Sequence, residues 1–166
     1  QIIPINGNAI ELGLKETQYH DRILGSQSPA FQSKMNNGQL VGGDVNNRVI
    51  LYVSSMMEVK SSMGVIVAAP TAGSCGALPG ALFGIAHSLE LSEEVLVRAM
   101  LSAGLIGVFI ASQATFAAEV GGCMAETGSG GGMAAAAIVE MKGGTLEQSI
   151  AAASMALQNS LGIICD

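Results

Sequence analysis

Apolar residues recur at three- and four-residue spacing along most of this chain, which is the pattern of amphipathic α-helices. The clearest series runs from Val49 through Val53 and Met56 to Met63. It predicts a helix over these residues, with Asp44 as its N-cap. Similar spacing returns in later stretches, so we expect the chain to form a bundle of helices.

Two of these later helices lie in the middle of the chain. One covers about residues 78–89, with Pro79 in its first turn, where the missing N–H group costs nothing. Ser92, which two glutamates follow, caps a long apolar helix that runs to about residue 111 or beyond. We expect this helix to be central and buried, because its longest apolar run, residues 99–112, is too short to span a bilayer.

Two more helices are predicted towards the C-terminus. Helix resumes at about residues 133–141, and Thr145 with Gln148 matches the capping box of a last helix that ends at Gly162. The glycine-dense stretch 117–132 predicts a turn, and it lacks the Gly-x-Gly-x-x-Gly and P-loop nucleotide motifs. Since no strand series and no long repeat occurs, the predicted fold class is all-α, a helical bundle with glycine-rich loops at one end.

Residues 1–43 have a weaker pattern. The apolar side chains that could line a short helix there are Leu12, Leu14, Tyr19, Ile23 and Leu24. Residues 25–44 are polar and broken by glycine and proline, which is typical of a long loop or flap. The chain therefore divides into an N-terminal segment with a flap, residues 1–43, and a helical domain, residues 44–166, which together form one domain.

The composition limits the classes of partner. Hydrophobic residues make up 49% of the chain and aromatic residues only 4%, so small aliphatic side chains must fill the core. Seven Lys and Arg residues and a net charge of −6 exclude an extended phosphate-binding surface, and hence nucleic acid, as a function. Because charged residues are only 12%, we expect another chain or domain to cover part of the surface.

The N-terminus lacks the basic region, apolar core and cleavage site of a signal peptide. It also lacks an initiating methionine, so we expect the chain to be a fragment of a longer protein. A cytoplasmic location, with no membrane association, is the expectation that follows.

A loop of small residues, 68–80, is the most distinctive stretch of the chain. It reads Ala-Ala-Pro-Thr-Ala-Gly-Ser-Cys-Gly-Ala-Leu-Pro-Gly and separates two apolar runs. Because small side chains leave the backbone uncovered, such a loop can approach a ligand closely and can present the thiol of Cys75.

Three cysteines each stand at a glycine-rich break beside a predicted helix end: Cys75, Cys123 and Cys165. Helix ends in a bundle can bring distant positions together, and three thiolates suit a soft metal or an iron–sulfur cluster with one open position. The other interpretation is that the cysteines fill the core, and spacing alone favours it.

The surroundings of the three cysteines change that balance. The motifs are Ala-Ala-Pro-Thr-Ala-Gly-Ser-Cys-Gly around Cys75, Glu-Val-Gly-Gly-Cys-Met-Ala-Glu around Cys123 and Leu-Gly-Ile-Ile-Cys-Asp around Cys165. With these motifs in this order, the chain from about residue 40 to its end resembles the iron–sulfur-dependent L-serine dehydratases. It is similar to their α chain, or to the catalytic domain of the fused form.

The resemblance implies an all-helical catalytic domain with a [4Fe-4S] cluster held by Cys75, Cys123 and Cys165, and a fourth iron without a protein ligand. The implied enzyme is an L-serine ammonia-lyase that converts L-serine into pyruvate and ammonia by eliminating water, as in amino-acid degradation and gluconeogenesis. A regulatory β domain or subunit and a homo-oligomer are implied as partners.

For an enzyme of this kind, the small-residue loop is the predicted place for the serine carboxylate. Thr71, Gly73 and Ser74 would bind it together with backbone N–H groups. Gly42 and Gly43 are predicted to close over the substrate as part of the flap.

The base that removes the α-proton is left unassigned. Its candidates are Lys60, Glu119 and Glu126, and at the position of Lys60 the family often has asparagine. His87 is predicted to be a structural histidine within a helix, and His20 lies in the N-terminal segment.

Two alternatives to serine deamination remain at this stage. A related cluster lyase would act on L-cysteine or another β-substituted amino acid. A non-catalytic helical interaction module would keep its thiols buried and unreactive.

Overall fold

The computed structural model describes residues 2–21 and 25–165, and within them every regular element is a helix. This confirms the predicted all-α class. The elements are α1 (Ile2–Lys15), α2 (Ser28–Asn36), α3 (Gly43–Ser61), a π-helical turn η1 (Gly76–Gly80), α4 (Ala81–Ser88), α5 (Glu93–Gln113), α6 (Ala118–Met141) and α7 (Leu146–Asn159).

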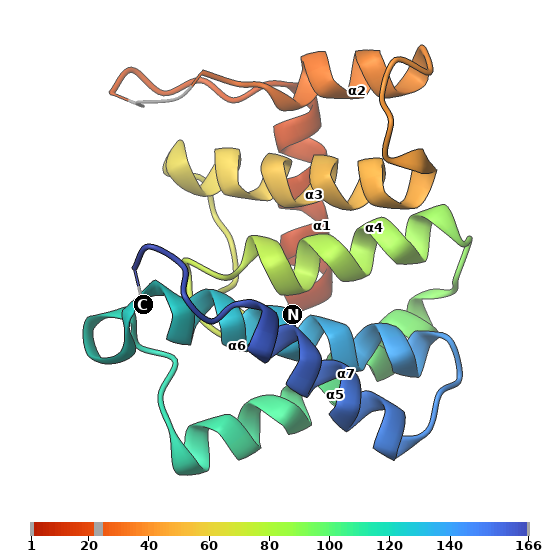
Figure 1. The fold of residues 1–166 in the computed structure, drawn as a ribbon. Coiled ribbons are helices and arrows are strands. Elements are labelled where there is room, and N and C mark those ends of the chain that lie inside the picture. The colour runs from red at the N-terminus through yellow and green to blue at the C-terminus, as the bar shows by residue number, and fades with distance from the viewer. Residues whose placement is uncertain (1, 22–24, 166) are drawn as a thin grey trace.

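The helices form a layered bundle. Figure 1 shows α2, α3, α4 and α6 stacked one beyond the next, with α1 running across the back of the upper layers. The helix α3 packs on α1, α2, α4 and η1, whereas α6 packs on α5 and α7. Two apolar clusters follow from this arrangement, one among η1, α4, α5 and α6 and the other between α1 and α3.

Three glycines at four-residue spacing bring η1 and α4 against α3: Gly76, Gly80 and Gly84. A Cβ atom at Gly80 would lie 2.8 Å from the Cα of Val53, and one at Gly84 would lie 2.8 Å from the Cα of Val49. Gly76 faces a methionine side chain of α3 in the same way. The two segments therefore touch backbone to backbone, and any larger residue at these positions would force them apart.

The glycine-dense stretch 117–132 is not the turn that the sequence predicts, because most of it belongs to α6. Only Gly122 has a non-helical conformation inside α6, with φ 71° and ψ 177°. The later glycines stay helical because neighbours pack against them. A Cβ at Gly130 would lie 2.9 Å from the Cβ of Ser74, and one at Gly132 would lie 3.1 Å from Leu157. Tertiary packing here overrides the low helix propensity of glycine.

The N-terminal segment is more helical than expected. The stretch predicted as a flap contains α2, which has a proline in its first turn. The face of α1 that packs inward consists of Asn6, Ala9, Ile10 and Gly13, whereas Leu12 is exposed. Tyr19 lies beyond the end of α1, and the predicted positions 23 and 24 lie outside the described residues. Asn6 can be buried because its side chain forms hydrogen bonds with both the N–H and the carbonyl of Val67.

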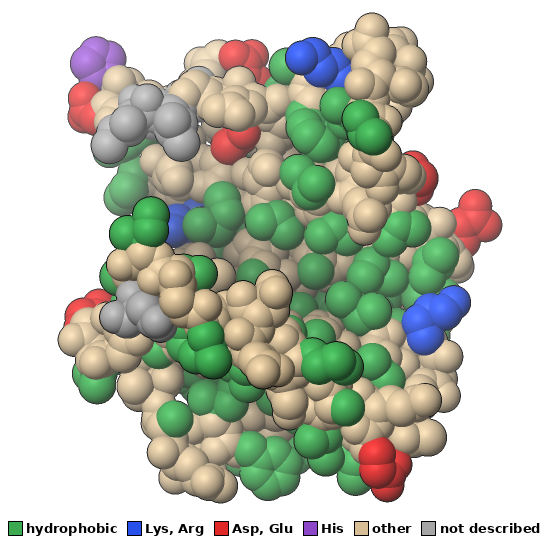
Figure 2. Space-filling view, in the orientation of Figure 1, with side chains coloured by type: hydrophobic (Ala, Val, Ile, Leu, Met, Phe, Trp, Pro, Cys, Tyr) green, Lys and Arg blue, Asp and Glu red, His purple; other side chains and the backbone are tan. Residues whose placement is uncertain are grey.

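The long apolar helix α5 is less buried than the sequence predicts. Only 22% of its most apolar stretch is buried, although its length and composition would allow it to cross a membrane. One stripe packs against α6, and the opposite side of the helix is exposed. The exposed large side chains are Val97, Leu101, Leu105, Val108 and Phe109. Figure 2 shows several apolar side chains at the surface towards the bottom of the view, where α5 lies.

We predict that G80A lowers the free energy of unfolding by about 1–3 kcal/mol, because the added methyl group overpacks a backbone contact. Gly80 has ordinary helical dihedrals, so no backbone strain contributes. The matched control is G104A, since a Cβ at Gly104 would meet nothing within 4 Å. G104A should stabilise its helix by about 0.5–1 kcal/mol. Urea denaturation measures both values, and equal effects of the two variants would contradict the packing argument.

Candidate functional site

Cys75 lies in the core immediately before η1. Its side chain is fully buried, and the thiol donates a hydrogen bond to the carbonyl oxygen of Ala72 at 3.0 Å and lies 4.0 Å from the sulfur of Met57. Burial raises the pKa of the Cys75 thiol, and the positive charge of Lys60 opposes that rise. The thiol therefore points into the contact between the loop and α3 and is held there as a neutral group.

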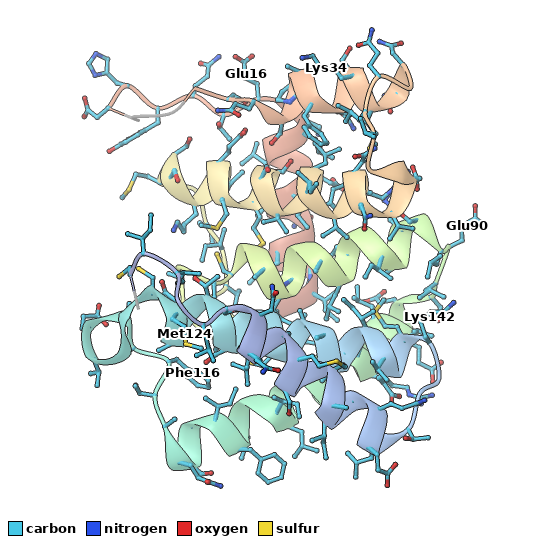
Figure 3. The ribbon with its side chains drawn as sticks, in the orientation of Figure 1. Glu16, Lys34, Glu90, Phe116, Met124 and Lys142 are labelled. Atoms are coloured by element: carbon cyan, nitrogen blue, oxygen red, sulfur yellow. The ribbon has the colours of Figure 1, made fainter. Side chains whose placement is uncertain are left out.

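Cys123 and Cys165 lie side by side, although they are 42 positions apart in the sequence. Gly122 breaks α6 just before Cys123, so a new helix start presents its N–H groups there. The N–H of Cys123 donates to the sulfur of Cys165 at 3.3 Å, and the N–H of Met124 donates to the carbonyl of Cys165 at 3.1 Å. Figure 3 shows Met124 on α6 beside the C-terminal segment. The hydrogen bond with Cys165 raises the pKa of Cys123, and the charge of Cys165 raises it further.

The three predicted cluster ligands do not all meet. Among residues 2–21 and 25–165, no group of three or more His, Cys, Asp and Glu side chains is placed to hold a metal ion. The structure brings Cys123 and Cys165 together, whereas Cys75 packs with the apolar cluster between α1 and α3. Cys75 is buried because the glycines of η1 allow the start of this turn to pack closely on α3.

The loop before Cys75 forms a small polar site with Glu126. The hydroxyl of Thr71 donates to Oε2 of Glu126 at 2.5 Å and lies 2.9 Å from the hydroxyl of Ser74. The other oxygen, Oε1, lies against Gly73, where a Cβ would come within 1.8 Å of it. Thr71, Gly73 and Ser74 thus line one small polar site, and the carboxylate of Glu126 lies beside the loop that is predicted to bind the serine carboxylate.

Glu126 is the candidate base that the structure brings to this site. It follows Cys123 by three positions, so both side chains project from the same face of α6. Burial raises the pKa of Cys75, and the negative charge of Glu126 raises it further. The same charge also raises the pKa of Cys123, in addition to the effect of Cys165. The carboxylate therefore lies between the loop and the cysteine pair. The three-residue spacing was the only sequence signal for this placement.

The other candidate bases divide between the site and the surface. Lys60, in the last turn of α3, is close enough to Cys75 to affect its pKa. Glu119 is exposed and precedes the break in α6. His20 pairs with a neighbouring aspartate on the surface. His87 is hydrogen-bonded to Tyr52, which agrees with its predicted structural role.

Gly42 and Gly43 do not reach the site. They lie at the first turn of α3, whereas Cys75, which ends the loop, lies 4.0 Å from the sulfur of Met57 towards the other end of this helix. A helix of 19 residues is about 28 Å long, and this length separates the two ends. The helix that follows these glycines places them away from the loop in this structure, and their role in covering the substrate stays a prediction.

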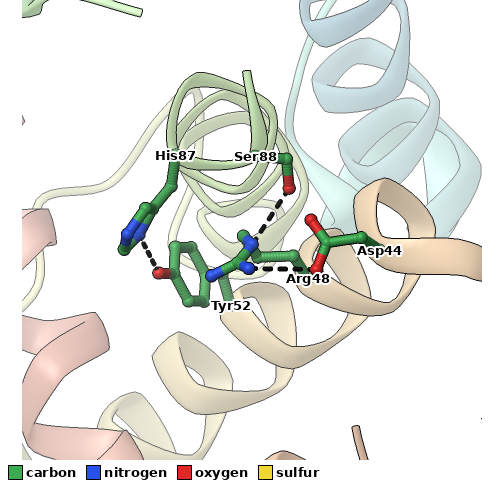
Figure 4. A network of polar contacts seen from close by, with 5 residues as sticks. All are labelled: Asp44, Arg48, Tyr52, His87 and Ser88. Atoms are coloured by element: carbon green, nitrogen blue, oxygen red, sulfur yellow. Dashed lines mark hydrogen bonds and ion pairs between the residues drawn. The ribbon is translucent and has the colours of Figure 1, made fainter. Parts of the chain in front are cut away.

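A polar network occupies that far end of α3, as Figure 4 shows. Arg48 donates to Asp44 and to Ser88, each at 3.0 Å, and the hydroxyl of Tyr52 is hydrogen-bonded to Nδ1 of His87. An open cavity of about 900 Å³ lies beside these side chains. Because the polar groups satisfy one another, the network ties α3 to α4, and the chemistry that the sequence predicts lies at the opposite end of the helix.

The chain is similar in sequence to a known protein family and to several of its members. Residues 2–166 match the family described as serine dehydratase alpha chain. The chain is 39% identical over 158 residues to the probable L-serine dehydratase, alpha chain, of Bacillus subtilis, covering 95% of this chain and 53% of that protein. It is 44% identical over 131 residues to the L-serine dehydratase, alpha chain, of Peptoniphilus asaccharolyticus, covering 79% and 45%.

A third relative is the probable L-serine dehydratase, alpha chain, of Latilactobacillus sakei. It is 48% identical over 109 residues, which are 66% of this chain and 52% of that protein. The chain thus spans about half the length of these three relatives. The match over residues 2–166, and the likeness to these relatives, show that the chain belongs to the serine dehydratase alpha-chain family.

Proposed function

We propose that this chain carries part of the active site of an L-serine ammonia-lyase, which eliminates water from L-serine and releases pyruvate and ammonia. The relatives named L-serine dehydratase support this assignment. The observation that carries it is the contact between Cys123 and Cys165 at the break in α6, one helical turn from Glu126 and its loop.

The cysteine pair suits an iron–sulfur cluster. Two soft thiol donors lie together at a helix start, where backbone N–H groups favour negative charge. When bound, the cluster supplies a Lewis acid that weakens the bond between the serine β-carbon and its hydroxyl group. The resemblance also implies Cys75 as a third ligand, but its thiol would have to leave the carbonyl of Ala72 and the core to reach the pair, so we expect it to contribute less to cluster binding than Cys123 and Cys165.

The chain's own residues would hold the substrate. The N–H groups of Ala72 and Gly73 donate to no protein group within the part of the chain that the structure describes, so they can receive an anion. The hydroxyls of Thr71 and Ser74 lie beside them. A serine carboxylate bound at this loop would place the rest of the substrate next to α6, because Glu126 already contacts the loop.

We also propose a partner for the chain. The relatives are named as alpha chains, and α5 exposes an apolar side that a further chain or domain would cover. A β subunit or domain and a second copy of the enzyme are the partners that the resemblance implies. The proposed enzyme works in the cytoplasm, where serine is available.

We predict that C123A and C165A each lose most of the iron and sulfide that the protein takes up in anaerobic reconstitution. C75A should retain clearly more iron, because its thiol is buried away from the pair, and should instead lower stability through the small cavity that it leaves. Iron and sulfide assays with a thermal melt measure both effects. Loss of iron in C75A equal to that in C123A would establish Cys75 as the third ligand, and full iron in C123A would contradict the cluster proposal.

We further predict that T71A weakens the affinity of the assembled enzyme for L-serine about 3- to 10-fold, the loss of one hydrogen-bonding group from the loop. T127A is the matched control, because Thr127 is exposed on α6. Pyruvate release measured against serine and cysteine gives KM for each. An unchanged serine KM in T71A would remove Thr71 from the site, and faster elimination from cysteine than from serine would favour the alternative lyase.

A further inference from the structure

Glu126 is a half-buried carboxylate that forms no ion pair with any other residue that the structure describes. Each ion pair between described residues involves other acidic groups, and the polar contact of Glu126 is with the hydroxyl of Thr71. Lys60 acts on Cys75 and forms no ion pair with Glu126 in this part of the chain. One oxygen of Glu126, Oε1, lies against Gly73, and the hydrogen bond with Thr71 uses the other oxygen, Oε2.

An unpaired carboxylate of this kind is a binding site for a cation. Partial removal of a carboxylate from water costs free energy, and a nearby positive charge offsets this cost. The loop it contacts also carries the N–H groups of Ala72 and Gly73, which favour an anion. A carboxylate acceptor and a set of N–H donors on one small loop are complementary to a zwitterion, an α-amino acid with its ammonium and carboxylate a few ångströms apart.

We infer that Glu126 binds the α-ammonium group of the substrate and thereby selects amino acids over hydroxy acids of the same shape. This inference rests on the proposed function, since it names the contact that would hold serine. Thr71 is the positioning residue, because its hydroxyl fixes Oε2 and leaves Oε1 to face the ammonium. Glu126 would then be a binding group, and the acceptor of the α-proton is another residue.

The test compares L-serine with 3-hydroxypropanoate, which has the same carboxylate and hydroxyl but no ammonium. The variant is E126Q, because glutamine keeps the shape and still accepts the Thr71 hydrogen bond while losing the charge. E126D retains the charge on a shorter side chain. E94Q is the control, since Glu94 is exposed on α5 and its loss changes the net charge equally.

We expect E126Q to bind L-serine about 10- to 100-fold more weakly than the unmodified assembled enzyme, the value of a charge-assisted hydrogen bond. Binding of 3-hydroxypropanoate should change by less than about threefold, because it makes no ammonium contact. E126D should recover part of the preference for serine, and E94Q should match the unmodified enzyme. Isothermal titration gives the affinities, and iron content and kcat are measured on the same samples.

Three results would overturn the inference. Equal weakening of both ligands in E126Q would mean that Glu126 only supports the loop. A fall in kcat with unchanged serine affinity would make it the proton acceptor, and loss of iron would make it a support for the cysteines. Serine binding without pyruvate release by the unmodified enzyme would overturn the proposed function alone, whereas absence of serine binding would overturn both.

Discussion

The site depends on the close contact between α3 and the segment formed by η1 and α4. With glycine at positions 76, 80 and 84, the backbone of this segment lies directly on Val49 and Val53 of α3. Cys75 immediately precedes this contact, so its burial follows from it. Thr71 and Ser74 precede Cys75 in the same loop, at the edge of this contact, where Glu126 of α6 reaches Thr71. The position of the polar loop therefore depends on this packing contact together with hydrogen bonds inside the loop, such as those between Thr71 and Ser74.

A second constraint places the cysteine pair. Gly122 adopts a positive φ that other residues rarely take, and it creates a helix start within α6. Cys165 reaches that start because α7 packs on α6 beside Gly128 and Gly132, and at Gly132 a Cβ would lie only 3.1 Å from Leu157. The two constraints meet at Glu126, which projects from the helix that begins at the break and contacts the loop that the first constraint positions.

Part of the fold could be predicted because local sequence and tertiary packing agree there. The capping box at Thr145 and the N-cap at Ser92 fixed the starts of α7 and α5, and both form as expected. The pattern failed where the buried face is not apolar. The inner face of α1 includes Asn6 and Gly13, one held by hydrogen bonds to a backbone and the other lying against a carbonyl of α3. The periodicity of apolar residues cannot predict such contacts. It also cannot predict that the glycines of α6 are helical.

The candidate site divides in the same way. Its residue types followed from the motifs, but the sequence could not show that Gly42 and Gly43 lie at the start of α3, and nothing in the spacing separates Cys75 from the other two cysteines. The importance of Glu126 depends on the lack of an ion pair between it and the other described residues, and only a three-dimensional arrangement reveals that. The region concentrates negative charge, since a carboxylate lies near thiols that become anionic when they bind metal. A substrate that brings its own ammonium group relieves this charge, whereas a hydroxy acid with only a carboxylate adds to it. The electrostatics of the site thus favour a zwitterion before any specific contact is counted.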